Sequence, residues 1–123
     1  MSLMPSGEHV FSDERRQKPR SLVSVPLRIY AAGRRLLMQA RTIDLSVAGA
    51  LVHGSAPLRV GQTVAVEVER GVARNPLTLQ AEVVRIATPN ARLKRHGIAL
   101  RFLGVSPLDE AIIESIIASA RGI

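Results

Sequence analysis

The chain contains no cysteine, which excludes disulfide bonds, thiolate metal sites and a cysteine nucleophile. Its aromatic residues are one tyrosine and two phenylalanines, Tyr30, Phe11 and Phe102. The core must therefore be built mostly from Val, Leu, Ile and Ala. No apolar run approaches the ~20 residues that span a bilayer, and the N-terminus shows no signal-peptide pattern. We therefore expect a cytoplasmic protein without membrane insertion.

Aliphatic residues and arginine are plentiful instead. The chain has 123 residues, 46% of them hydrophobic, which suffices for one domain with its own core. The formal net charge of +7 indicates an anionic partner: a nucleotide, a nucleic acid or an acidic membrane face. Nearly all of the positive charge is arginine, whose planar fork suits phosphates and guanine edges.

Alternating apolar residues predict a series of short strands. The first starts at Leu22, and the others cover 34–43, 49–54, 63–70, 76–88 and 97–103. In the strand over 76–88 the apolar phase changes near Val83, which predicts a bulge. The sequence DLSVAGA, 44–50, is expected to interrupt the second strand.

The last segment changes to a three- and four-residue period, which predicts an amphipathic helix. Ser106 and Asp109 have the spacing of a capping box around Pro107, and Arg121 with Gly122 marks the end. The apolar stripe comprises Leu108, Ile112, Ile113, Ile116, Ile117 and Ala120. Short strands followed by one helix predict a mostly β fold, a small barrel with the helix on its side or across one end.

A first candidate motif is ERRQKPR, residues 14–20, ahead of the first strand. Arg16 and Arg20 are four residues apart, and Pro19 biases Lys18 towards extended geometry. On an extended arm, two guanidinium groups could hold a phosphate or the O6/N7 edge of guanine. Taken alone, the segment is better explained as a solvated basic linker.

A second candidate motif is DLSVAG, residues 44–49. Asp44 and Ser46 can cap a turn through their own backbone, and Gly49 can serve a positive φ or a close backbone approach. Taken alone, this structural interpretation is the stronger one. In a binding site, the carboxylate could instead accept hydrogen bonds from guanine N1–H and N2–H. Ser46 could add a polar contact, and Gly49 could leave room for a ring or a phosphate.

The two motifs together resemble the signature of the PilZ domain family, R-x-x-x-R followed by [D/N]-x-S-x-x-G. Arg16 and Arg20 match the first part, and Asp44, Ser46 and Gly49 match the second. The sequences LRVGQTVAVEVE, AEVVRI and HGIALRF also resemble the family's run of strands. The resemblance covers roughly residues 14–103, most of the chain.

This resemblance implies a six-stranded antiparallel β-barrel with a flexible basic N-terminal arm that binds the bacterial second messenger cyclic di-GMP. The implied ligand-binding residues are Arg16, Arg20, Asp44, Ser46 and Gly49, with Arg15 as a helper. By similarity, the arginines contact guanine and phosphates, the Asp and Ser hold a guanine edge, and the glycine acts sterically.

From these arguments we expect a mobile tail over 1–13, a barrel with its basic arm over 14–104, and a packed helix over 105–123. The expected function is that of a stand-alone receiver or adaptor. Its arm closes over the ligand and changes the surface shown to an unidentified downstream protein. No cofactor, metal or catalysis is expected, because His9, His53 and His96 are scattered without metal-site spacing.

Three alternatives stay open at this point. A basic barrel could bind nucleic acid, although the few aromatics leave little for bases to stack on. The chain could be a protein-interaction module without a ligand, and the helix could mediate a homodimer. Further cations are candidates for ligand contact by charge alone, with exposed surface charge as the better explanation for each: Arg85, Arg92, Lys94 and Arg95.

Overall fold

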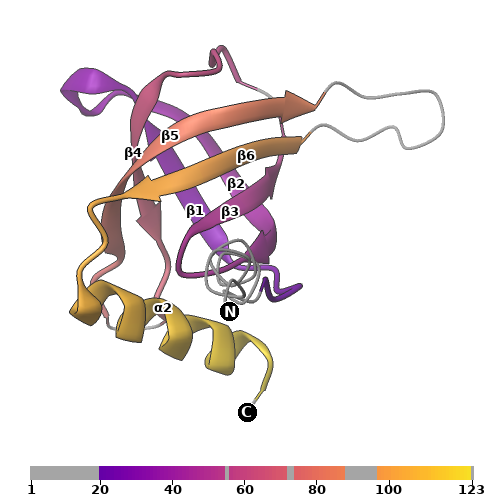
Figure 1. The fold of residues 1–123 in the computed structure, drawn as a ribbon, viewed down its shortest axis with the longest axis vertical. Helices are drawn as coiled ribbons and strands as arrows, with labels where there is room; N and C mark the ends of the chain where they lie inside the picture. The colour runs from indigo at the N-terminus through magenta and orange to yellow at the C-terminus, as the bar shows by residue number, and fades with distance from the viewer. Residues whose placement is uncertain (1–19, 55, 72–73, 88–96, 123) are drawn as a thin grey trace, which may run out of the picture.

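A computed structural model describes residues 20–54, 56–71, 74–87 and 97–122. The described strands are antiparallel and close into a barrel in the order β1-β2-β3-β6-β5-β4 (Figure 1). Their bounds are β1 Pro26–Tyr30, β2 Leu36–Leu45, β3 Gly49–His53, β4 Thr63–Val68, β5 Leu77–Ala87 and β6 Gly97–Leu103. The 3-10 turn η1, Ala32–Arg34, joins β1 to β2, and helix α2, Pro107–Ala120, follows β6. The predicted mostly β barrel with one C-terminal helix is confirmed.

Strand periodicity explains the core. Every second residue of β1, β4 and β6 turns an aliphatic or aromatic side chain inward, because side chains alternate across a strand. The buried set includes Val23, Val25, Leu27, Ile29, Val64, Val66, Val68, Ile98, Leu100 and Phe102. This burial follows the apolar alternation from which the strands are predicted, and Ile29 and Val66 are fully buried at 0% exposure.

The bulge expected in the fifth strand is confirmed. Pairing with β6 shifts register between Val83 and Arg85, and the extra residue, Val84, points outward with 42% of its surface exposed. After this shift Ile86 packs against the core again. One inserted residue thus explains why the apolar phase changes along β5.

The expected end of the second strand is wrong. Asp44 and Leu45 do not interrupt β2 but form its last two residues, paired with Leu51 and Ala50 of β3. A register shift between Thr42 and Asp44 allows this, because it bends the strand without ending it. The second motif therefore begins inside the barrel wall.

Helix α2 lies across one end of the barrel (Figure 1). Its start is confirmed: Ser106 Oγ accepts a hydrogen bond from the Asp109 N–H at 3.0 Å, and the Asp109 carboxylate accepts one from the Ser106 N–H at 3.2 Å. Ile113, Ile116 and Ile117 are buried against the barrel. None of the helices in the described part of the chain is long and apolar enough to cross a membrane.

Two members of the predicted apolar stripe do not reach the core. Leu108 is 69% exposed, because at about 100° per residue it points roughly 140° away from Ile113 and opposite to Ile117. Ala120 is exposed as well and borders a cavity instead of the packed core. The buried face of α2 is therefore narrower than the sequence pattern indicates.

A polar cluster joins the outer faces of β1 and β4. Arg28 and Glu67 are direct cross-strand partners, and Arg28 Nε donates to the Glu67 carboxylate at 3.1 Å. The Tyr30 hydroxyl donates to the same carboxylate at 3.0 Å. The hydrogen bond from Arg28, opposed by desolvation and aided by Tyr30, lowers the pKa of Glu67 below its usual value.

Gly49 allows β3 and β6 to approach each other closely. A Cβ at this position would lie 2.1 Å from the Leu100 carbonyl oxygen, far inside van der Waals contact. The residue does not have a positive φ. Of the two structural roles considered for this glycine, close backbone approach is therefore the one observed.

The lowered pKa of Glu67 has a consequence for stability. A carboxylate with a folded-state pKa below its unfolded-state pKa stabilises the fold above the unfolded value, and this contribution is lost as the pH falls through the folded pKa. We expect Glu67→Gln to be less stable than wild type at pH 7 and to approach wild type at an acid pH below the folded-state pKa of Glu67. Urea unfolding at both pH values measures this. The control is Glu114→Gln, which removes a carboxylate from the exposed face of α2. An equal deficit at both pH values would contradict the expectation.

A methyl group at Gly49 should force β3 and β6 apart. We expect Gly49→Ala to lower the free energy of unfolding by about 1–3 kcal/mol or more, as overpacking does in well-packed sites. Thermal unfolding followed by circular dichroism measures the change. An unchanged melting temperature would show that the strands separate at no cost and would refute the proposed packing role.

Candidate functional site

The arm root, residues 21–25, continues the pairing of β1 along β2. The Ser21 N–H donates to the Leu45 carbonyl and the Leu45 N–H donates to the Ser21 carbonyl, both at 2.9 Å. Closer to the barrel, the Thr42 N–H donates to the Val25 carbonyl at 3.0 Å. These backbone hydrogen bonds at its two ends align the arm root with the last four residues of β2.

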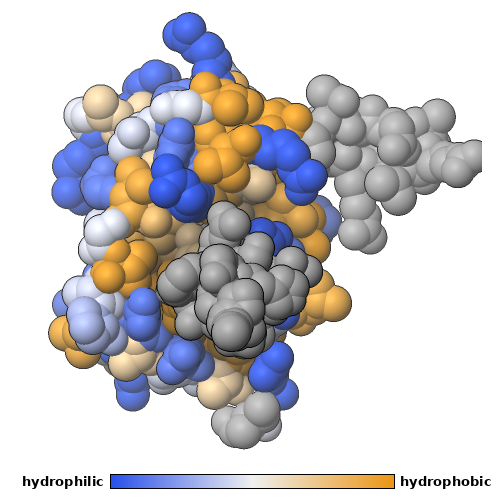
Figure 2. All heavy atoms as spheres, in the orientation of Figure 1, coloured by the Kyte–Doolittle hydropathy of each residue, from blue (hydrophilic) through white to orange (hydrophobic). Residues whose placement is uncertain are grey.

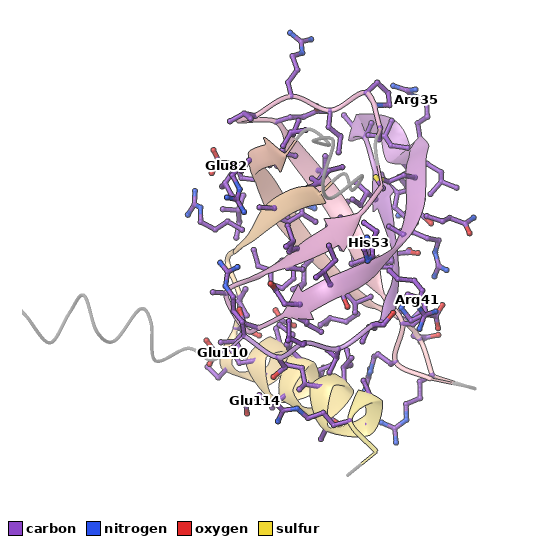
Figure 3. The ribbon with its side chains drawn as sticks, turned by 90° about the vertical axis from the view of Figure 1, so that its right-hand side faces the viewer. Arg35, Arg41, His53, Glu82, Glu110 and Glu114 are labelled. Carbon is purple, nitrogen blue, oxygen red and sulfur yellow. The ribbon has the colours of Figure 1, made fainter. Side chains whose placement is uncertain are left out.

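Side chains of β2 complete this attachment. The buried Thr42 hydroxyl accepts a hydrogen bond from the Val25 N–H at 2.9 Å and donates one to the Val23 carbonyl. Arg41 donates to the Ser24 hydroxyl at 2.7 Å and to its carbonyl at 2.8 Å. In Figure 3, Arg41 lies towards the end of the barrel that α2 covers, and Arg35 lies towards the opposite end. Since polar backbone groups need partners, these contacts hold the arm root in an extended form without a regular strand.

Ser46 organises the turn that follows β2. Its hydroxyl accepts hydrogen bonds from the N–H groups of Ala48 at 3.1 Å and Gly49 at 3.3 Å. Its backbone N–H also donates to the Gly49 carbonyl at 2.9 Å. The side chain is buried, with 4% exposure. The expected turn-capping role is thus confirmed for Ser46, and a ligand contact by this residue stays a prediction.

Asp44 does not cap the turn. It is 8% exposed, and Arg20 Nη1 lies 3.6 Å from one of its carboxylate oxygens. The arginine side chain is 68% exposed, so most of its donors face solvent. This ion pair brings one residue of each motif together, and the arm root is what places it.

The remaining predicted site residues divide into two groups. Gly49 lies at the start of β3, close to Ser46. Its observed role is to leave space for the Leu100 carbonyl group of β6. Arg85 lies on β5, opposite Ala99 of β6, and is exposed. The other candidate cations fall outside the described residues: Arg15, Arg16, Arg92, Lys94 and Arg95.

Two arginines near the site were not identified from the sequence. Arg101 of β6 pairs across the sheet with Gly49 and forms an ion pair with Glu82. Arg121, at the end of α2, donates to the Ser21 hydroxyl at 2.9 Å. Neither belongs to a motif, and only strand register and helix packing bring them near residues 44–49.

A separate cavity of about 560 Å³ opens between α2 and the barrel, lined by Ser24–Pro26, Glu69–Gly71, Ile116, Ser119 and Ala120. Neither Asp44 nor Ser46 lines it, so this cavity is distinct from the place where Arg20 approaches Asp44. Among the described residues, no group of three His, Asp or Glu side chains could hold a metal ion.

One face of the described molecule is mixed in character. Outside the grey atoms, the face shown in Figure 2 carries hydrophilic residues interspersed with apolar ones. The charge that the described arginines contribute is partly neutralised locally, by Asp44, Glu67 and Glu82.

Comparison with known proteins relates this chain to solved structures. The PilZ domain of YcgR from Escherichia coli, described with c-di-GMP, matches at 24% identity over 88% of this chain and 92% of that chain, with a TM-score of 0.69. YcgR from Escherichia coli in complex with c-di-GMP matches at 26% identity over 88% of this chain and 46% of that chain, with a TM-score of 0.69. The Bacillus subtilis inhibitor of motility, MotI/DgrA, shares the fold at 13% identity and a TM-score of 0.66, over 88% of this chain and 50% of that chain.

A search of curated protein sequences found no match. The sequence model of the PilZ domain, by contrast, matches residues 14–119. That match includes the arm, the whole barrel and almost all of α2. The expectation from the two motifs is confirmed, and this chain belongs to the PilZ domain family.

Proposed function

We propose that this chain binds cyclic di-GMP between its basic arm and residues 44–49 and acts as a non-catalytic receiver. The observation that carries the proposal is the 3.6 Å approach of Arg20 to Asp44, because it unites the two motifs at one place. Family membership supports it. So does the similarity to YcgR, a protein described in complex with c-di-GMP.

The chemistry of the two side chains is complementary to guanine. A carboxylate accepts hydrogen bonds and can take both N1–H and N2–H of the base. A guanidinium group donates and suits the O6/N7 edge or a phosphate. Asp44 and Arg20 together can therefore address opposite edges of one guanine, or a guanine and its neighbouring phosphate.

Ligand binding requires these two residues to exchange partners. The guanidinium of Arg20 and the N1/N2 edge of guanine both offer adjacent N–H donors to the same carboxylate. At 3.6 Å the contact is longer than a normal hydrogen bond and the Arg20 side chain is 68% exposed, so guanine, with two adjacent donors, can replace Arg20 at Asp44. The freed guanidinium then turns to the phosphates or to O6/N7.

The arm, residues 14–20, supplies the rest of the proposed mechanism. Its cations repel one another without ligand, and a doubly charged ligand neutralises them, so that the arm closes over it with Arg16 and Arg15 in contact. Closure changes the surface presented to a separate protein, which makes this chain an adaptor. The chain spans less than half of the matched YcgR chain.

Nucleic-acid binding has less support. The Tyr30 hydroxyl is held by Glu67 at 3.0 Å, on the outer face where β1 meets β4. Phe102 is only 6% exposed. Within the described residues, the aromatic platform that single-strand binders use for stacking is absent.

Calorimetric titration with cyclic di-GMP at physiological salt tests the proposed function. Wild type should bind saturably, and the stoichiometry will show whether one ligand or a stacked pair is bound. We expect Arg20→Ala and Asp44→Ala each to weaken binding about 10- to 100-fold, because each removes a charge-assisted hydrogen bond. Arg59→Ala is the matched control: it removes the same charge from the loop at the opposite end of the barrel, and binding should persist.

The titration also discriminates against the alternatives. No heat with cyclic di-GMP, together with strongly salt-dependent binding to oligonucleotides, would refute the proposal in favour of nucleic-acid binding. If neither ligand binds and an acidic protein is captured through Arg16 and Arg20, the chain is an interaction module instead.

Hydrogen exchange tests the closure of the arm. We expect amides of residues 14–20 to exchange rapidly in the free protein and to gain protection when cyclic di-GMP binds, because closure orders the backbone. Amides in the middle of β4 should not change and serve as the internal control. Equal protection of the arm with and without ligand would contradict the proposed ordering.

A further inference from the structure

One polar contact joins the two ends of the described chain beside the proposed site. Arg121 Nη2 donates a hydrogen bond to the Ser21 hydroxyl at 2.9 Å, across 100 residues of sequence. Ser21 is 4% exposed, and its backbone is paired in both directions with Leu45. A buried hydroxyl that accepts from a charged donor makes a stronger contact than a neutral pair.

The end of helix α2 determines the position of the Arg121 guanidinium. The Arg121 N–H donates to the Ile117 carbonyl and the Gly122 N–H donates to the Ser119 carbonyl, which closes the last turn of α2. Ile113, Ile116 and Ile117 fix the helix on the barrel. A cation at a helix C-terminus is also favoured by the helix dipole. The position of the side chain thus follows from the packing of α2 rather than from the arm.

The residues that Arg121 holds are the immediate neighbours of the ion pair. Ser21 follows Arg20 in the chain, and Leu45 follows Asp44. Any shift of the Ser21–Leu45 pair would move Arg20 relative to the carboxylate. An arm root that is already in place also lowers the ordering cost of closing the arm on a ligand.

We propose that Arg121 is a positioning residue for the ligand site: it fixes Ser21 through its hydroxyl and so holds the arm root, from which Arg20 extends, beside residues 44–49. This inference rests on the proposed function. It adds a third, C-terminal segment to a site whose sequence motifs are confined to residues 14–49. It also connects the last turn of α2 to the arm root through the hydrogen bond between Arg121 and Ser21.

A double-mutant cycle on the affinity for cyclic di-GMP tests the proposal. We expect Arg121→Ala and Ser21→Ala each to weaken binding about three- to tenfold, the range of one net hydrogen bond. The double variant should be no weaker than Arg121→Ala alone, because both changes remove one contact. Arg121→Lys should recover part of the loss. Arg59→Ala, with the same charge removed from the opposite end of the barrel, should retain wild-type affinity.

Salt dependence separates positioning from simple charge attraction. The factor lost in Arg121→Ala should be similar at 0.1 M and 0.5 M salt, whereas a long-range charge effect would be screened. A loss that vanishes at 0.5 M salt would overturn the proposal. So would a loss in Arg121→Ala without one in Ser21→Ala, since the guanidinium would then act on the ligand directly.

A ligand-free measurement keeps this inference separate from the proposed function. In Arg121→Ala, the amides of Ser21 and Leu45 should exchange faster with solvent than in wild type, while the amides of Val64 and Val66 in β4 stay protected. Unchanged exchange at Ser21 and Leu45 would refute the positioning role, whatever the protein binds. If exchange accelerates as expected and wild type binds no cyclic di-GMP, the proposed function fails and the positioning contact stands.

Discussion

The backbone pair between Ser21 and Leu45 is the constraint on which the candidate site depends. Its two 2.9 Å hydrogen bonds carry the antiparallel pairing of β1 and β2 beyond the start of the regular strand. Without them, the chain ahead of β1 would leave the barrel at Val25, and Arg20 would have no fixed relation to Asp44. The first motif becomes part of a site only because the second motif begins inside β2.

Thr42 explains how this extension is possible. The register of β2 shifts after Thr42 to stay paired with β3, and a regular ladder to the arm cannot continue past such a bend. The buried Thr42 hydroxyl replaces the missing ladder contacts, because it can accept from one backbone group and donate to another. The same bend turns the Asp44 carboxylate towards the arm. One irregularity therefore serves both the attachment of the arm root and the placement of the acceptor near Arg20.

Local signals in the sequence predicted most of the fold. Alternation revealed the strands and the bulge after Val83, and the Ser106 capping box revealed the start of α2. The sequence does not predict strand ends that depend on register. Asp44 is expected outside β2 but lies within it, paired with Leu51 after a register shift. Such a bend leaves no mark in the apolar pattern. Leu108 was assigned to the buried stripe because its spacing is helical, although only the angle to the barrel determines burial.

The site shows the same division between local and long-range information. The motif spacing pointed to Asp44 and Ser46, and the chemistry of their side chains suggested guanine. The contact from Arg121 could not be predicted, since a single arginine after a helix is also an ordinary helix end. Gly49 illustrates the reverse case: its sequence context allowed three roles, and the 2.1 Å that would separate an added Cβ from the Leu100 carbonyl oxygen identifies a packing role.

Closure of the barrel limits where a response to ligand can occur. Each strand is hydrogen-bonded on both sides in the order β1-β2-β3-β6-β5-β4, and its core is closely packed, so a strand cannot shift without breaking a ladder. The arm root and α2 lie outside this ring at one end. They touch each other through Ser21 and Arg121. Under the proposed function, a change at Asp44 would therefore pass most readily along this outer path, where movement breaks the few contacts of the arm root and Arg121 instead of the continuous backbone ladder of the barrel.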